Sequence, residues 1–344
     1  MSGASRPPAQ FASGSEEPAR KSRPTVEVVV PTVGRASLQR TLAPVVGRLP
    51  VTVVDDRRVA DPPLALPAGV RVVRSGGRGP AAARNDGWRV SSAEWIAFLD
   101  DDVEPPGDWL DALLGDLAGC GDDVAGSQAR ITVPLPADRR PTDWERSTAG
   151  LQTAVWATAD LAYRRAALVA VGGFDERFPR AYREDADLGL RLTRAGWRIE
   201  RGRRQVAHPV RPAAWQQSIR SQRGNADDVL MRALHGRDWR AAASVPAGRR
   251  PWHLATTAGL LGAVVLPRRA RRLATGTWLV LTARFAWLRI SPGPRTPREI
   301  VSMLVTSAVL PVAAVWHWTV GWLRLPRLLG RAGPVAHPVP HPRP

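Results

Sequence analysis

The stretch that decides the fold is Trp95-Ile96-Ala97-Phe98-Leu99-Asp100-Asp101-Asp102, in which five apolar residues precede three aspartates. A short, continuously apolar run is typical of a strand buried on both faces of a parallel sheet. Ligands gather at the carboxyl ends of such strands, so the triplet predicts a polar site at that edge. Crowded carboxylates need a compensating cation or donors, and their hard oxygens suit Mg²⁺ or Mn²⁺. A capping or turn cluster explains the same three residues, because Asp is common before helices.

Three further strands are predicted upstream of this stretch, with helices predicted at residues 37–48 and 81–89. The strands are residues 26–30, 51–54 and 70–73, followed respectively by Pro31-Thr32, by Asp55-Asp56 and by the glycine-rich segment 75–80. Strands that alternate with helices at this spacing predict an α/β fold, with a mostly parallel central sheet and helices on both faces. The polar residues after each strand are then expected at one edge of that sheet.

Several polar clusters have two readings when each is taken alone. Asp55-Asp56 suits a ribose hydroxyl or a base N–H, and it equally suits a turn. The glycine-rich segment allows a diphosphate to approach the backbone, with Arg84 as a donor, but it is neither a Walker loop nor a Rossmann fingerprint. The pair Glu184-Asp185 opens a predicted helix, where acids are typical caps, and His208 alone is typical of a structural histidine.

The order of these motifs along the chain is more specific than any one of them. The series is Pro31-Thr32-x-Gly34-Arg35, Asp55-Asp56, Gly79-x-Ala81-x-Ala83-Arg84-Asn85, the stretch 98–102, Gly172-Gly173-Phe174-Asp175-Glu176, Glu184-Asp185-x-Asp187-Leu188-x-Leu190-Arg191, and residues 196–199 before His208. Taken together, residues from about 26 to about 215 resemble the family 2 glycosyltransferases of bacterial cell-wall and polysaccharide synthesis. The resemblance implies the GT-A fold and an inverting transfer from a nucleotide sugar.

The resemblance also implies where the donor and its metal bind. Thr32, Asp56 and Arg84 match positions that hold the nucleotide, and Asp101 matches the residue that faces the ribose. Asp102 matches the residue that faces a divalent cation, Mg²⁺ or Mn²⁺, on the diphosphate. The remaining expected nucleotide contacts are Pro31, Arg35, Asp55, Asn85 and Asp100, and the other expected metal ligands are Asp100 and His208.

On the acceptor side, the resemblance implies that Asp185 is the general base, which takes the proton from the acceptor hydroxyl. Glu184 would orient the acceptor, while Gly173, Phe174 and Asp175 would shape its site. A base works best away from the cation, whose field would lower its pKa, and Asp185 lies on a different element from Asp102.

Two departures from the family pattern are visible. Asp160 stands where the family often has Asn, which puts an acceptor contact there in doubt. The Gln-x-x-Arg-Trp signature of processive synthases is missing, and residues 216–221 read Gln-Gln-Ser-Ile-Arg-Ser instead. We therefore expect the transfer of a single sugar.

The charge of the chain is unevenly distributed. The 344 residues include 49 Lys+Arg and 31 Asp+Glu, for a formal net charge of +18. Residues 1–240 hold 35 basic and 30 acidic residues, net +5, whereas residues 241–344 hold 14 arginines and one acid, Glu299, net +13. The total is typical of nucleic-acid binding, but the late arginines interleave with apolar segments and no reader motif is present. We expect an anionic membrane surface as partner and no nucleic acid.

These patterns divide the chain into four regions: a disordered tail at 1–24, the GT-A domain at 25–240, a basic, apolar helical membrane-associated region at 241–326, and a second disordered tail at 327–344. Residues 300–323 carry no formal charge. As a helix they would extend ~36 Å, enough to cross a ~30 Å hydrocarbon core. Pro311 and His317 favour a surface or re-entrant helix equally well, and both readings stay open.

Residues 1–24 contain no apolar secretory segment, and the single cysteine, Cys120, excludes an intramolecular disulfide. We therefore expect a location on the cytoplasmic face of the cell membrane. The expected acceptor is a glycolipid, a polyprenyl-linked glycan or a wall polymer. Two alternatives remain: a catalytically silent membrane-bound protein that keeps the fold, and a sugar-nucleotide pyrophosphorylase, although the Gly-rich, Arg-Lys-containing opening loop of the latter is missing.

Overall fold

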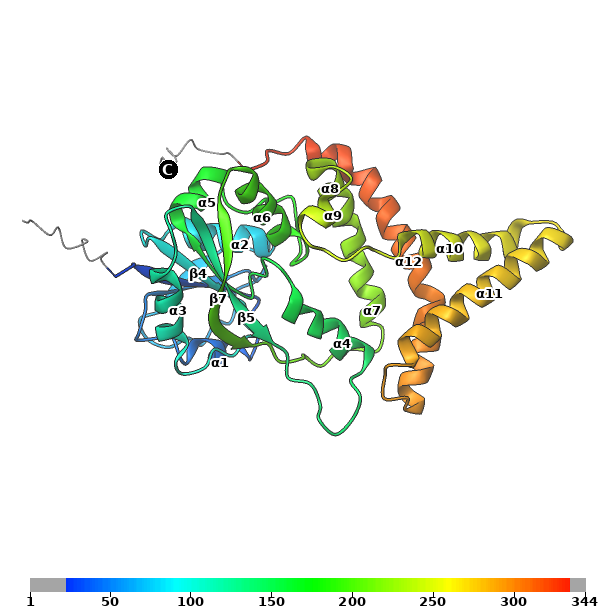
Figure 1. Ribbon diagram of the computed structural model, residues 1–344, viewed down its shortest axis with the longest axis horizontal. Helices are drawn as coiled ribbons and strands as arrows, with labels where there is room; N and C mark the ends of the chain where they lie inside the picture. The colour runs from blue at the N-terminus through cyan, green and yellow to red at the C-terminus, as the bar shows by residue number, and fades with distance from the viewer. Residues whose placement is uncertain (1–22, 335–344) are drawn as a thin grey trace, which may run out of the picture.

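The computed structural model describes residues 23–334, in which seven strands form one sheet in the order β3-β2-β1-β4-β6-β5-β7 (Figure 1). The strands are β1 (Val26–Thr32), β2 (Val51–Asp55), β3 (Arg71–Arg74), β4 (Trp95–Leu99), β5 (Val124–Thr132), β6 (Asp160–Arg164) and β7 (Arg198–Ala207). Strand β6 is antiparallel to its neighbours β4 and β5, while the other pairs are parallel. The expected α/β class with a mostly parallel sheet is confirmed.

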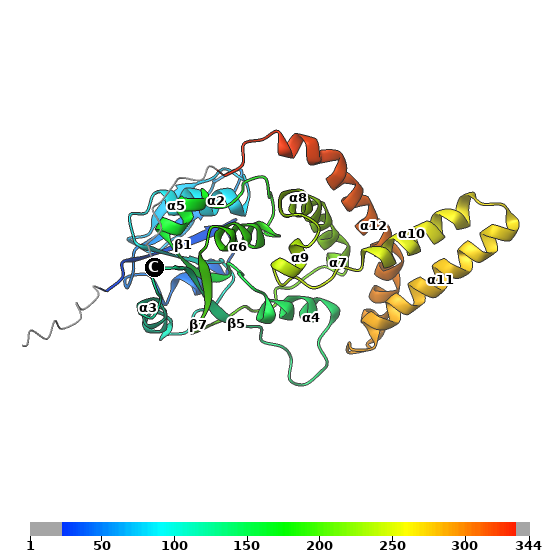
Figure 2. The same cartoon turned by 45° about the horizontal axis from the view of Figure 1, so that its top comes forward.

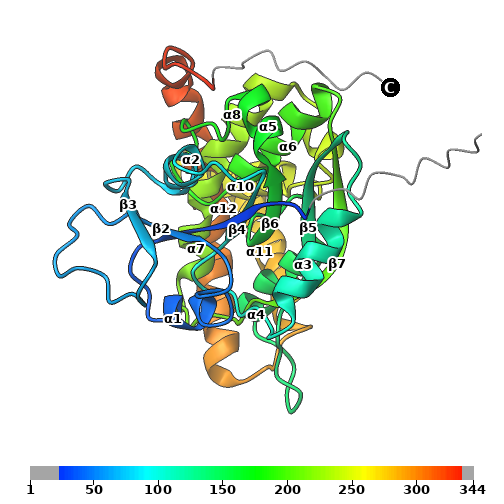
Figure 3. The same ribbon diagram turned by 90° about the vertical axis from the view of Figure 1, so that its left-hand side faces the viewer.

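Helices cover both faces of the sheet (Figure 3). The side chains of each central strand point alternately to the two faces, so each face has its own apolar core that the helices close. In β4, Trp95, Ala97 and Leu99 face one core, and Ile96 and Phe98 face the other. The first core is closed by α1 (Leu38–Leu42) and α3 (Trp109–Ala118), the second by α2 (Pro80–Arg89), α5 (Arg165–Val171) and α6 (Glu184–Arg194). The central strands are therefore buried on both faces, as their apolar sequences predict.

The carboxyl edge of the sheet collects the polar residues as expected. Thr32, Asp55 and Asp100 end or follow three neighbouring parallel strands. His208 follows β7 at the same edge, where its backbone N–H donates to the Thr132 carbonyl at 2.8 Å. Because β6 runs the other way, its first residue, Asp160, also lies here, opposite Leu99.

The chain after β7 is helical among the described residues. The helices are α7 (Gln217–Arg220), α8 (Asn225–His235), α9 (Trp239–Ala242), α10 (Arg250–Val265), α11 (Arg268–Ile290) and α12 (Pro297–Leu329), while α4 (Asp143–Ala149) lies earlier, between β5 and β6. Helices α10 and α11 form a hairpin that projects away from the sheet domain in two views (Figures 1 and 2). Helix α12 lies between this hairpin and α8.

Helix α12 is the one helix in residues 23–334 that is long and apolar enough to cross a membrane, which by length and composition alone is weak evidence of a span. It packs closely on the sheet domain, since a Cβ added at Gly321 would lie 2.9 Å from Ala226 of α8. The helix continues to Leu329, three residues beyond the boundary expected at 326. Most of the expected tails, residues 1–22 and 335–344, lies outside the described residues.

Candidate active site

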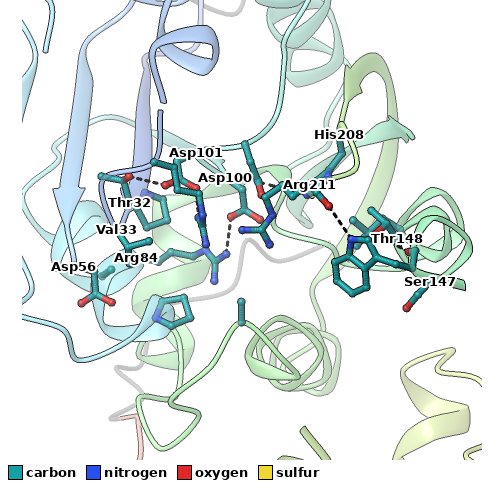
Figure 4. Close-up of a pocket in the computed structure, with 18 residues that line it drawn as sticks. Thr32, Val33, Asp56, Arg84, Asp100, Asp101, Ser147, Thr148, His208 and Arg211 are labelled. Carbon is teal, nitrogen blue, oxygen red and sulfur yellow. Dashed lines mark hydrogen bonds and ion pairs between the residues drawn. The ribbon is translucent and has the colours of Figure 1, made fainter. Parts of the chain in front are cut away.

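A pocket of about 450 Å³ opens at the carboxyl edge of the sheet (Figure 4). Its walls come from the ends of β1, β2, β4 and β7, from the start of α2, and from α4. The expected site residues that line it are Pro31, Thr32, Arg35, Asp56, Arg84, Asp100, Asp101, Asp102 and His208. The sheet therefore brings together residues separated by up to about half of the chain.

The first wall joins β1 to the aspartate triplet. Asp101 is almost fully buried. It accepts a hydrogen bond from the Thr32 hydroxyl at 2.5 Å and forms an ion pair with Arg35. The Gly34 N–H donates to the Thr32 oxygen at 2.9 Å, which closes the loop after β1. Asp101 thus holds Thr32 and Arg35 in place at the pocket.

The two aspartates after β2 point in different directions. Asp55 is buried and pairs with Arg57 at 2.7 Å, and this guanidinium holds the pKa of Asp55 below its ordinary value. Asp56 faces the pocket and accepts from the Ser75 hydroxyl at 2.6 Å and the Gly79 N–H at 3.0 Å. Only Asp56 of the pair lines the pocket (Figure 4).

Arg84 occupies the centre of the site. It is buried and donates to Asp100 at 2.9 Å and to Glu184 at 2.8 Å, with its guanidinium 5.5 Å from the centre of the Phe174 ring. Burial disfavours its charged form, but the Asp100 and Glu184 carboxylates outweigh that effect and raise the pKa of Arg84. Arg84 is therefore a fixed positive charge at the pocket wall.

Asp102 and His208 meet at the other end of the pocket. The His208 Nε2 lies 3.5 Å from Asp102, and Arg211 pairs with the same carboxylate at 3.0 Å. Burial, followed by the charge of Asp100, raises the pKa of Asp102. The Nδ1 of His208 is buried without a hydrogen-bond partner in the described residues.

The expected metal ligands fit a divalent cation by their chemistry. Asp100, Asp102 and His208 offer hard carboxylate oxygens and an imidazole nitrogen, including that unpartnered Nδ1. Within residues 23–334, no three His, Cys, Asp or Glu side chains are grouped closely enough to hold a metal as they stand. Arg211 supplies the positive charge beside Asp102 in this conformation.

The expected acid pair lies at the start of α6, beside the pocket rather than in its lining. Glu184 is buried against Arg84, whereas Asp185 is half-buried and accepts the Ala186 N–H at 2.7 Å. Burial raises the pKa of both carboxyl groups, and Arg84 opposes the shift. Ala181, in the loop before α6, lines the pocket and brings this helix start close to it.

Asn85 and the loop 172–176 lie away from the pocket. The Asn85 side chain donates to the Phe174 carbonyl and accepts the Phe174 N–H, both at 2.9 Å. Gly173 has φ +74°, and an added Cβ would lie 2.5 Å from the Asn85 Oδ1. Phe174 is buried, and Asp175 pairs with Arg177 at 2.6 Å. These residues fix the second core against α2, so their expected ligand contacts have no support in the geometry.

Asp160 likewise belongs to a buried structural pair. It accepts from the Trp109 Nε1 at 2.6 Å and pairs with the buried Arg204 at 2.9 Å. Burial raises the pKa of Asp160. Its carboxylate links α3, β6 and β7 beneath the site and does not line the pocket.

Sequence reasoning missed several pocket residues. Arg211 follows His208 by three positions, and Trp144, Ser147 and Thr148 lie on one face of α4. A signal for α4 was present, because Thr142 and Glu145 form a capping box, with the Thr142 side chain accepting the Glu145 N–H. Because α4 is short and lies far along the chain from the aspartate triplet, its place in the pocket was not predicted.

Comparisons with known proteins bear on this site. Residues 27–166 match the family model described as glycosyl transferase family 2. The pre-mycofactocin glycosyltransferase of Mycobacterium tuberculosis is 32% identical over 200 residues, which cover 53% of this chain and 42% of that protein. The glycosyltransferase AglE of Haloferax volcanii is 29% identical over 141 residues, 39% of this chain and 46% of that protein. The chain thus spans less than half the length of these curated relatives.

Solved structures match the chain at lower sequence identity. Glucosyl-3-phosphoglycerate synthase of Mycobacterium tuberculosis in complex with phosphoglyceric acid has a TM-score of 0.44 and 16% identity, covering 65% of this chain and 82% of that one. The same enzyme with Mn²⁺, uridine diphosphate and phosphoglyceric acid has a TM-score of 0.43 and 17% identity, covering 65% and 80%. The family whose model matches residues 27–166, glycosyl transferase family 2, is the one that the order of motifs predicts.

Proposed function

We propose that the chain is a divalent-cation-dependent, inverting glycosyltransferase. It transfers one sugar from a nucleotide diphosphate donor to a hydroxyl group of an acceptor presented at the cytoplasmic face of a membrane. The observation that carries the proposal is the pocket of about 450 Å³, in which a family 2 domain joins Asp56, Arg84, the aspartate triplet and His208 at one sheet edge.

The donor is held by complementary charge and hydrogen bonding. Asp56 and Thr32, at one end of the pocket, suit the base and ribose. Arg35, Arg84 and Arg211 line the same pocket and suit the two phosphates, because guanidinium groups donate in a fork that matches phosphate oxygens. Asp102, Asp100 and His208 would hold the cation. When bound, the cation neutralises the charge that develops on the departing nucleoside diphosphate.

Asp185 is proposed as the general base. The acceptor oxygen forms a bond to the anomeric carbon, the bond from that carbon to the diphosphate breaks, and the hydroxyl proton passes to the Asp185 carboxylate. Two observations support this role: burial raises the pKa of Asp185, which makes its carboxylate a stronger base, and Asp185 lies on α6, whereas Asp102 follows β4. Glu184 accepts from Arg84 through its Oε1, which positions the helix start, while its Oε2 is buried without a hydrogen-bond partner in the described residues.

The test separates donor binding from transfer. Thermal unfolding with UDP-, GDP- and dTDP-sugars and Mn²⁺ should identify the donor, since a ligand that binds only the folded protein raises the midpoint. Asp185→Asn should lower turnover by at least 10²-fold with nearly unchanged donor affinity, whereas Asp102→Ala should weaken Mn²⁺-dependent donor binding. Asp111→Asn, exposed on α3, is the matched control. Wild-type turnover by Asp185→Asn would exclude it as the base.

The membrane part of the proposal rests on the C-terminal helices. Helix α12 is packed on α8 along part of its length, so lipid cannot surround it without displacing the sheet domain. We therefore propose attachment to the membrane surface through the exposed α10–α11 hairpin rather than a transmembrane span. Arg268, Arg269, Arg271 and Arg272 at the tip of the hairpin match an anionic lipid surface.

A further inference from the structure

A second cavity, of about 880 Å³, adjoins the donor pocket and shares Trp144, Ser147 and Arg211 with it. Helix α4 and residues 210–222 form one wall of this cavity, and α10, α11 and α12 form the other. It therefore lies at the junction of the sheet domain and the helical region that we propose to contact the membrane. A molecule in this cavity reaches the donor pocket past Trp144 and Arg211.

The charged lining of the cavity has unpaired positive groups. Two of its three acids form ion pairs, Asp143 with Arg289 at 2.7 Å and Glu145 with Arg139 at 2.7 Å. The third, Glu299, accepts the Asp143 N–H at 2.9 Å and has no ion pair within residues 23–334.

Among the cavity's arginines, Arg249 and Arg298 are exposed and have no ion pair within residues 23–334. The Arg249 guanidinium lies 5.7 Å from the centre of the Phe285 ring, so its hydrogen-bond donors stay available. The Nδ1 of His253, which also lines the cavity, is buried without a hydrogen-bond partner there. The charged groups of the cavity without an ion pair in the described residues are thus two arginines and one glutamate, so their net charge is positive, which suits an anion.

The helices also give the cavity an apolar side. Phe285 and Leu288 of α11 and Met303 and Leu310 of α12 line it, and Trp215 lies at its rim with 58% of its surface exposed. Arg289 holds this side against the sheet domain, since its buried guanidinium donates to Thr306 at 2.8 Å and pairs with Asp143. The cavity therefore offers an apolar wall and unpaired cationic groups at one site.

We propose that this cavity binds the acceptor, and that the acceptor is an amphiphile with an anionic group, a phosphate or a carboxylate, beside its apolar part. Arg249 and Arg298 bind the anionic group, and the α11 and α12 side chains contact the apolar part. The inference rests on the proposed function, because it places the acceptor hydroxyl beside the donor pocket through the shared residues Trp144 and Arg211.

The experiment measures the binding of a probe amphiphile to the full chain by calorimetry, with Mn²⁺ and UDP present. Decyl phosphate below its critical micelle concentration should bind at least tenfold more tightly than decyl glucoside and than inorganic phosphate. Decanoate distinguishes recognition of a carboxylate from that of a phosphate. Arg249→Gln/Arg298→Gln should weaken decyl phosphate binding at least tenfold and leave the UDP affinity unchanged. The control, Arg130→Gln/Arg203→Gln, removes two exposed charges from β5 and β7.

Each result has a definite meaning. Equal binding of decyl glucoside would overturn the anionic specificity, and equal binding of inorganic phosphate would overturn the apolar part. An equal loss in the control variant, or no loss in Arg249→Gln/Arg298→Gln, would overturn the location. Failure to bind any nucleotide, with decyl phosphate binding intact, would instead contradict the proposed function and leave the cavity as an amphiphile site.

Discussion

Arg84 connects the parts of the site at the scale of single residues. It is fixed between Asp100, which follows β4, and Glu184, which opens α6, so the donor pocket and the helix start that carries the proposed base share one buried cation. Removing either carboxylate would leave a buried charge partly uncompensated, which is strongly destabilising in general. The geometry of the donor wall and of the α6 start are therefore coupled through this side chain.

Arg211 makes a prediction about metal affinity. It pairs with Asp102 at 3.0 Å and competes for the carboxylate that a cation needs. We expect Arg211→Gln to bind Mn²⁺ alone several-fold more tightly and to bind the nucleoside diphosphate more weakly. Titration calorimetry with Mn²⁺ and, separately, with UDP measures both. Arg48→Gln, which loses a surface pair with Asp111, is the control. Unchanged Mn²⁺ affinity would show that Arg211 does not compete.

Asn85 makes a prediction about stability. Its side chain satisfies the N–H and the carbonyl of buried Phe174 and accepts the Trp88 Nε1–H at 3.0 Å, so Asn85→Ala leaves three buried groups unpaired. Each costs about 1–3 kcal/mol in general. We expect a large loss in the free energy of unfolding, measured by urea denaturation, with UDP affinity unchanged at temperatures where the variant is folded. A selective loss of nucleotide binding in a stable variant would restore the direct contact expected from the sequence.

The raised pKa of Asp185 predicts a pH dependence. A general base must be ionised, so kcat/KM should fall as the pH falls through the pKa of Asp185, at a pH above the ordinary value of 3.8. Asp102 also has a raised pKa, so the profile is measured at saturating Mn²⁺, which removes its titration from the profile. An acidic limb at or below the ordinary aspartate value would contradict the assignment.

At the scale of elements, α4 separates the two cavities and contributes residues to both. It has only seven residues, and none of them is buried, so its stability depends on its capping box. The pair of Glu145 with Arg139, together with the hydrogen bonds from Thr142, lowers the pKa of Glu145 to about 2. The cap therefore stabilises α4 above the ordinary glutamate range and weakens as the pH falls towards 2.

The cap of α4 gives the next prediction. Thr142→Ala removes the acceptor of the Glu145 N–H and should cost about 1 kcal/mol, which lowers the midpoint of thermal unfolding by ~2–4 °C. Because Trp144 lines both cavities, donor affinity should fall as well. Thr142→Ser keeps the hydroxyl and should restore both properties. Loss of donor affinity in Thr142→Ser as severe as in Thr142→Ala would show that the cap is not the cause.

At the scale of the whole molecule, much of the positive charge lies on the part that projects furthest from the sheet domain. The net +13 of residues 241–344 is concentrated in part at the tip of the projecting α10–α11 hairpin (Figure 1), where Val264, Val265 and Leu273 are also exposed. Basic and apolar side chains together suit an anionic bilayer surface. The donor pocket lies at the carboxyl edge of the sheet, and the second cavity lies between the sheet domain and α10, α11 and α12.

Membrane binding gives the last prediction. Arg268, Arg269, Arg271 and Arg272 each contribute ~1 kcal/mol near an anionic surface, so replacing all four by Gln should weaken binding to phosphatidylglycerol vesicles at least tenfold. Vesicle sedimentation measures this, and 1 M salt should release the protein because the Debye length falls to ~3 Å. Replacing Arg71, Arg74, Arg130 and Arg203 is the control. Retention in 1 M salt and at alkaline pH would instead favour insertion of α12.

The sequence by itself determined the central sheet and its polar edge. A continuously apolar strand such as 95–99 is stable in the interior of a parallel sheet, where both of its faces are buried. The aspartates that directly follow such a strand therefore lie at the edge of the sheet. The sequence did not predict β5 and β7, because polar or exposed residues interrupt both strands and leave no continuous apolar run. These strands form because they pair with each other, which satisfies their backbone hydrogen bonds whatever their side chains are.

Tertiary structure decided which polar residues share a cavity. Asp55 and Asp56 are neighbours in the chain, yet Asp55 pairs with Arg57 outside the pocket lining, whereas Asp56 lines the pocket. Arg211, Trp144 and Arg84 meet the triplet only because separate elements end at one edge. The second cavity exists only where α4 meets α11 and α12. Local sequence fixes the periodicity and the buried faces of an element, but side-chain direction and contacts between distant elements depend on how the whole chain packs.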